Sequence, residues 1–71
     1  MKPGTDFIVA NGTPKELKLP CTIAEFLISC GFKSTQVVVE HNGTVLARSD
    51  LPGVVLKAGD RLEVIVPVAG G

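Results

Sequence analysis

Three side chains in this sequence could take part in nucleophilic, redox or metal chemistry: Cys21, Cys30 and His41. Eight residues separate the two cysteines, whereas redox dithiols and zinc knuckles use a Cys-x-x-Cys spacing. His41 is the single histidine, and no cysteine or carboxylate stands beside it at the spacing of a metal site. We therefore expect that these residues bind no metal ion. We expect His41 to be a half-buried residue of a strand.

The two cysteines have structural explanations as well as chemical ones. Cys30 continues the apolar stripe of a predicted helix, so we expect it to pack in the core. Cys21 precedes the helix start, where the helix dipole can lower the pKa of a thiol, but a spacer residue before the cap explains it equally well. Cytosolic thiols are normally reduced, so both are expected to be free. A thiol redox protein remains one alternative function.

The rest of the sequence contains no nucleophile motif, phosphate-binding loop or pair of catalytic carboxylates. Five glycines stand where a turn or a helix cap requires one: Gly12, Gly31, Gly43, Gly53 and Gly59. Seven Lys and Arg residues balance seven Asp and Glu residues, and the signs are interspersed. This pattern is typical of a solvated surface and argues against a nucleic-acid partner, because phosphate binding needs unbalanced cations.

Gly70 and Gly71 have no such explanation. A tail without Cβ atoms can thread a narrow channel of a partner enzyme and present a carboxylate to chemistry there. A carboxylate is a poor electrophile and must first be activated, for instance as an acyl-adenylate made from ATP. The partner must then supply the metal ion and phosphate-binding groups that this chain lacks. The alternative interpretation is a frayed tail or a glycine linker.

The elements that must position these residues are two hairpins, a helix and a last strand. Asn11-Gly12 and Asn42-Gly43 best tolerate the positive φ angles of tight hairpins. Thr22 to Glu25 matches a capping box, which predicts a helix of two to three turns from Ile23 to a stop at Gly31. The predicted strands are 7–10, 16–19, 37–41, 44–47 and 61–66. One helix on a mixed sheet of four or five strands is an α+β architecture.

The length of 71 residues predicts one domain, residues 1–67, followed by a flexible tail, residues 68–71. A core this small leaves no room for a deep catalytic cleft, so we expect a carrier or binding module and no enzyme. No apolar run reaches the ~20 residues needed to span a bilayer, and no signal peptide precedes Phe7. We therefore expect a soluble, cytoplasmic protein without a membrane partner.

The whole pattern resembles the ubiquitin-like β-grasp sulfur carriers, specifically the ThiS family of thiamine biosynthesis. The resemblance runs from Phe7 to Gly71 and is most specific where Leu-x-x-Gly-Asp-Arg-x-Glu, residues 56–63, is combined with the final Gly-Gly. Other matching segments are 9–12, 22–27, 37–43 and 47–49. Residues 66–71 also resemble the ending of the small subunit of molybdopterin synthase, which leaves the sulfur acceptor open.

The resemblance implies that Gly71 is adenylated by a ThiF-like enzyme with ATP and converted to a thiocarboxylate. That group would donate sulfur to a thiazole synthase of the ThiG type, after a donor such as a cysteine desulfurase had supplied the sulfur. Gly70 would belong to the tail, and the chain itself would bind no cofactor. The alternative is a β-grasp interaction or modifier domain without sulfur chemistry.

Strand alternation predicts a partner-binding surface on the sheet. If Leu62, Val64 and Val66 face the helix, then Ile65 faces outward with Val38, beside the tail residue Val68. The alternative is that these are scattered apolar surface residues, which are common on any protein.

Overall fold

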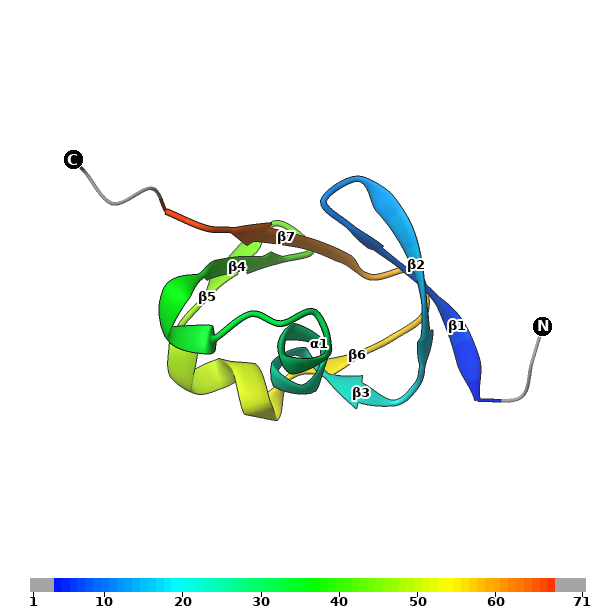
Figure 1. The fold of residues 1–71 in the computed structure, drawn as a ribbon. Helices are drawn as coiled ribbons and strands as arrows, with labels where there is room; N and C mark the ends of the chain where they lie inside the picture. Colours follow the sequence, from blue (N-terminus) through cyan, green and yellow to red (C-terminus); the bar gives the residue numbers. More distant parts are fainter. Residues whose placement is uncertain (1–3, 68–71) are drawn as a thin grey trace.

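The computed structural model describes residues 4–67 of the chain, and Figure 1 shows its elements. Five strands form one sheet in the order β2-β1-β7-β4-β5, and the short strands β3 and β6 form a second sheet. In chain order the strands are β1 Thr5–Ala10, β2 Thr13–Lys18, β3 Cys21–Thr22, β4 Val38–His41, β5 Thr44–Leu46, β6 Val55–Leu56 and β7 Arg61–Ile65. The helix α1 spans Ile23–Ser29 and lies under the large sheet.

The large sheet is mixed, because β1 and β7 run parallel while all other neighbouring strands are antiparallel. Both Asn-Gly pairs form the predicted hairpin turns, with φ of 50° and 78° at Asn11 and Gly12 and of 49° and 88° at Asn42 and Gly43. Positive φ at both central residues is the twist that suits two antiparallel strands. The predicted α+β architecture is therefore confirmed.

The helix begins and ends as its sequence predicts. The Thr22 hydroxyl accepts a hydrogen bond from the Glu25 N–H at 3.0 Å, and the Glu25 carboxylate accepts one from the Thr22 N–H at 2.8 Å. At the other end, the N–H groups of Gly31 and Phe32 donate to the carbonyls of Ile28 and Leu27. Gly31 has a φ of 83°, so the pattern is a Schellman stop and the helix is limited to two turns.

The core lies between α1 and the inner face of the sheet. Successive strand residues alternate between the two faces, so every second residue of β7 is buried. The buried hydrophobic residues are Ile8, Ala10, Ile23, Phe26, Leu27, Val37, Val39, Leu51, Leu56, Leu62 and Val64. Within residues 4–67, no helix is long and apolar enough to cross a membrane.

Two predictions about the core are wrong. Cys30 is exposed, because the helix ends at Ser29 and Cys30 is its C-cap, where the chain already turns toward Gly31. Val66 is 53% exposed rather than facing the helix, because β7 ends at Ile65 and the inner apolar layer stops with Val64.

Several elements differ from the sequence-based expectation in their limits. The first strand starts at Thr5, two residues before the predicted start, and pairs along its full length with β2. The loop after β5 forms the 3-10 helix η2, Arg48–Gly53, and a shorter one, η1, spans Ser34–Gln36 before β4. The β3–β6 pair, which joins Cys21 to Leu56, was not predicted.

Candidate functional site

The outer face of the sheet, on the side away from α1, carries an exposed apolar pair. Val38 of β4 and Ile65 of β7 are opposite one another in the antiparallel ladder and are 38% and 50% exposed. The residues next to them, Val39 and Val64, are buried. The structure therefore brings together the two residues that the strand pattern predicted to face outward.

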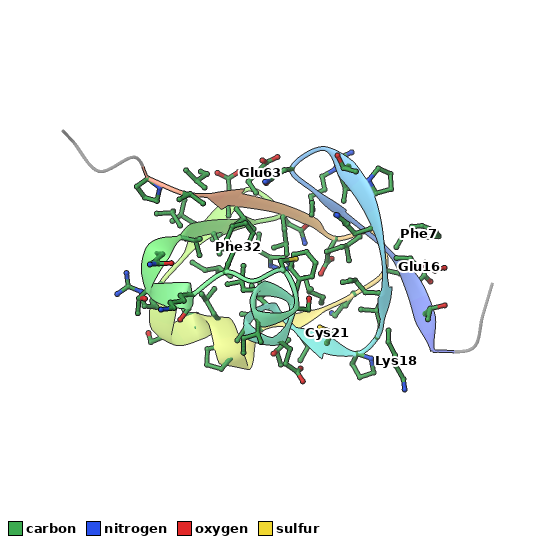
Figure 2. All side chains as sticks on the ribbon, viewed as in Figure 1. Phe7, Glu16, Lys18, Cys21, Phe32 and Glu63 are labelled. Atoms are coloured by element: carbon green, nitrogen blue, oxygen red, sulfur yellow. The ribbon has the colours of Figure 1, made fainter. Side chains whose placement is uncertain are left out.

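Two acidic residues and one further valine continue this face. Glu40 and Glu63 are the next outward pair on β4 and β7, and Val45 of β5 lies opposite Glu40 and is 63% exposed. Figure 2 shows Glu63 on the sheet side away from α1. Like charges placed directly across two strands destabilise a sheet slightly. The outer face, defined here as Val38, Glu40, Val45, Glu63 and Ile65, therefore has an apolar pair in one row and two carboxylates with Val45 in the next.

Val45 is a member of this face that the strand pattern had not been used to predict. Leu46, the next residue of β5, is half-buried. Since neighbouring strand residues face opposite sides of a sheet, Val45 is expected to face outward. The Asn42-Gly43 hairpin also places β5 beside β4, so alternation along β5 was enough to predict this direction. Val68, Gly70 and Gly71 lie outside the described residues, so their predicted roles stay predictions.

Asp60 directly precedes β7, at the end of the strand away from Ile65. Its carboxylate is the centre of a group of hydrogen bonds, called here the Asp60 hub, that includes His41, Asn42 and Lys57. One carboxylate oxygen, Oδ2, lies 2.9 Å from His41 Nε2 and accepts a hydrogen bond from the Lys57 N–H at 2.9 Å. The other oxygen, Oδ1, accepts one from Asn42 Nδ2 at 3.2 Å. Asn42 Oδ1 in turn accepts from the Arg61 N–H at 2.8 Å. The hub thus ties the turn after β4 to the first residue of β7.

This arrangement explains His41 without a metal. The His41 and Asp60 side chains are 20% and 13% exposed, so the predicted half-buried position of His41 is confirmed. Burial alone raises the pKa of Asp60, but the hydrogen bonds from His41, Lys57 and Asn42 outweigh it, and the pKa lies below its ordinary value. In residues 4–67, no three His, Cys, Asp or Glu side chains are grouped to hold a metal ion.

The cysteines are apart and reduced. Cys21 is half-buried and its thiol donates to the Thr22 carbonyl at 3.3 Å, while Cys30 lies at the far end of α1. Burial raises the pKa of the Cys21 thiol, and the Glu25 carboxylate adds to this effect. The geometry therefore favours the spacer interpretation of Cys21 over activation by the helix dipole.

Comparisons with known proteins agree with the fold. The family model of the ThiS family matches residues 8–71. The crystal structure of the thiamine biosynthesis protein ThiS from Geobacter metallireducens has a TM-score of 0.79 at 28% identity and covers 92% of this chain and 99% of that one. An NMR solution structure of a thiamine biosynthesis protein from the same organism has a TM-score of 0.76 at 28% identity, with coverages of 92% and 87%.

Two curated relatives are both called thiazole synthase. The protein from Magnetococcus marinus is 34% identical over 61 residues, which are 86% of this chain and 19% of that protein. The protein from Paramagnetospirillum magneticum is 30% identical over 64 residues, or 90% of this chain and 20% of that protein. The chain thus spans about a fifth of the length of the curated relatives it matches. Because the family match covers most of its residues and the fold superposes on solved members, the chain belongs to the ThiS family of ubiquitin-like β-grasp sulfur carriers.

Proposed function

We propose that this protein carries sulfur as a thiocarboxylate on Gly71 for the formation of the thiazole ring of thiamine. The observation that supports this most strongly is the family match, which runs through both tail glycines to residue 71. The protein is then a co-substrate of other enzymes rather than a catalyst. Gly70 and Gly71 lack side chains, so the tail can enter a narrow active site.

The Gly71 carboxylate is converted to a thiocarboxylate in two steps. In the first, the carboxylate attacks the α-phosphorus of ATP, which forms an acyl-adenylate and releases pyrophosphate. In the second, hydrosulfide attacks the acyl carbon, AMP leaves with the bonding electrons, and a thiocarboxylate remains. A persulfide from a cysteine desulfurase can replace hydrosulfide if a thiol then supplies two electrons to cleave the sulfur–sulfur bond.

Two enzymes must recognise the carrier in this scheme. A ThiF-like adenylating enzyme supplies ATP and the groups that bind it, and a thiazole synthase accepts the sulfur. The synthase is favoured as the acceptor because two relatives that contain a similar stretch of 61 and 64 residues are called thiazole synthase. The thiamine biosynthesis proteins of similar fold point to the same product rather than to molybdopterin.

The outer face is the proposed docking surface for the adenylating enzyme. Val38 and Ile65 form an exposed apolar pair at the end of β7, from which the chain continues toward Val68 and the tail glycines. A partner that covers this pair gains apolar burial and holds the tail in a fixed direction. Glu40 and Glu63 beside the pair favour a partner with a basic residue at the edge of its contact surface.

The function is tested by intact mass spectrometry. After incubation with ATP, a ThiF-like enzyme and sulfide, the mass should rise by about 16 Da, since one oxygen is replaced by sulfur. A chain without Gly71 should show no change. A mass that stays constant in the complete reaction, or isopeptide-linked adducts in its place, would contradict the proposal and favour a modifier or interaction domain.

The docking surface has its own test. We expect Ile65→Glu to raise the KM for adenylation about tenfold, because a carboxylate replaces an apolar contact at the interface. Val55→Glu is the matched control, since Val55 is 45% exposed on β6, outside the outer face. Equal kinetics for the two variants would refute the assignment of the outer face.

A further inference from the structure

The strand β2 is an edge of the large sheet, and some of its backbone groups point away from the sheet. Within residues 4–67, β1 is the only strand beside it. The Phe7 carbonyl and the Val9 N–H of β1 bond on the opposite side, to Gly59 and Asp60. Hydrogen-bonded and non-hydrogen-bonded pairs alternate in an antiparallel ladder. Glu16, which lies opposite Phe7, therefore directs its N–H and C=O outward.

Lys18 is the next residue of this outward series. The Leu19 N–H donates to the Gly4 carbonyl at 2.7 Å, so the residue after Lys18 belongs to the series that bonds to β1. Glu16 and Lys18 thus each offer one donor and one acceptor at the edge, whereas Pro14, the other outward residue, has no N–H. A strand edge with such groups is a ready template for another strand.

The side chains of Glu16 and Lys18 carry opposite charges. Both are exposed, and within residues 4–67 neither forms an ion pair. Figure 2 shows them on the side of β2 that is turned away from α1. Leu17 between them points to the other face of the sheet, where it packs against the core and is half-buried. The edge therefore has two opposite charges on one face and a partly exposed leucine on the other.

We propose that β2 pairs antiparallel with β2 of a second copy of this chain, about a two-fold axis at Leu17. In this register Glu16 of each copy lies opposite Lys18 of the other. Each such pair exchanges two backbone hydrogen bonds and places opposite charges side by side. An axis at Glu16 or at Lys18 would instead place two like charges opposite each other, which destabilises a sheet. The charge pattern therefore selects one register.

Leu17 favours the same register, because it meets its own copy at the axis. Side chains of a non-hydrogen-bonded pair approach each other most closely, so each Leu17 covers apolar surface that the other leaves exposed. A contact about a two-fold axis is self-complementary, and every favourable pair in it occurs twice. Because only one strand of each copy takes part, we expect a weak dimer that buries less than about 1,200 Å².

The dimer goes beyond the proposed function and does not depend on it. The pairing edge is β2, whereas Val38 and Ile65 of the outer face lie on β4 and β7. Dimerisation therefore leaves this apolar pair open in both copies. The other edge strand, β5, has only three residues, and Val45 alone has outward backbone groups there. The longer edge of β2 is thus the better template for a second copy.

Sedimentation equilibrium of the full-length chain tests the dimer. Between about 10 μM and 1 mM we expect the dimer fraction to rise with concentration. Glu16→Lys and Lys18→Glu should each raise the dimer Kd at least about tenfold, because the axis places each like-charge pair in the interface twice. Lys33→Glu is the matched control, since Lys33 is exposed but directly precedes η1, outside β2.

Combining the two substitutions tests the register. An equimolar mixture of the Glu16→Lys and Lys18→Glu variants should form a mixed dimer, since every charge then lies opposite one of the other sign. The double variant, which exchanges the two charges within one chain, should dimerise like the wild type. Thermal unfolding of each variant checks that the fold is intact.

Hydrogen exchange distinguishes strand pairing from other modes of association. The Glu16 and Lys18 amides should exchange more slowly as the concentration rises, while the Val45 amide on the β5 edge serves as an internal reference. A chain that stays monomeric up to about 1 mM would overturn this inference. So would single variants that dimerise like the wild type, or a dimer in which the two β2 amides stay unprotected. Formation of the thiocarboxylate at Gly71 is measured separately and does not depend on these results.

Discussion

The Asp60 hub predicts a pH-dependent loss of stability on substitution by asparagine. Asp60 accepts three hydrogen bonds, from His41, Asn42 and the Lys57 N–H, and its side chain is 13% exposed. A hydrogen bond to a charged group contributes about 1.5–3 kcal/mol, and asparagine keeps one acceptor oxygen. We therefore expect Asp60→Asn to lower the free energy of unfolding at pH 7 by about 2 kcal/mol. For a domain of this size the corresponding fall in Tm is about 10 °C.

The pH dependence follows from the direction of the Asp60 pKa. Its folded-state pKa lies below the ordinary value of 3.8, so the charged form stabilises the fold above that value. This contribution is lost as the pH falls through the folded-state pKa. A protonated Asp60 resembles asparagine in charge and shape. The difference in the free energy of unfolding between the wild type and Asp60→Asn should therefore be largest at pH 7. It should become small at a pH below the folded-state pKa of Asp60.

Urea unfolding at several pH values, followed by circular dichroism, measures this difference. Asp50→Asn is the matched control, because the Asp50 carboxylate is exposed and accepts one hydrogen bond, from the Ala47 N–H at 3.2 Å. We expect the control to lose less than about 1 kcal/mol. The hub would not stabilise the fold as described if Asp60→Asn lost no more free energy of unfolding than Asp50→Asn at pH 7. The same conclusion would follow if the loss in Asp60→Asn were equal at every pH.

Three further predictions concern the helix, the core and the thiols. Thr22→Ala removes the N-cap hydroxyl and should lower the free energy of unfolding by about 1 kcal/mol in urea titrations. Leu51→Ala should lower it by about 3 kcal/mol, because Leu51 is 2% exposed and the substitution leaves a cavity. In the native protein a maleimide should modify exposed Cys30 before Cys21, whose pKa is raised by burial; the reverse order by mass spectrometry would contradict this.

The local elements of the fold could be predicted from the sequence because their signals are short-range. The two Asn-Gly turns and the Thr22–Glu25 capping box each depend on four or fewer neighbouring residues, and all three form as predicted. The outward direction of Ile65 also follows from simple alternation along β7. These features need no knowledge of distant contacts.

The sequence-based predictions are wrong or incomplete where contacts between residues far apart in the sequence determine the structure. The pairing of β3 with β6 joins residues more than thirty positions apart, and neither two-residue strand has a pattern of its own. The hub joins His41 to Asp60 across a separation of 19 residues. Cys30 continued the helical period, but the Schellman stop at Gly31 ended the helix before that period could bury it.

If this carrier supplies the sulfur of the thiazole ring, labelled sulfur loaded on it must reach the thiazole product. The carrier is loaded with ³⁴S from labelled sulfide, ATP and the adenylating enzyme, freed of small molecules, and mixed with thiazole synthase and its other substrates. We predict that the label appears in the thiazole product while the carrier returns to its original mass. A thiazole product without the label, or a loaded carrier that keeps its ³⁴S, would show that this protein is not the sulfur donor.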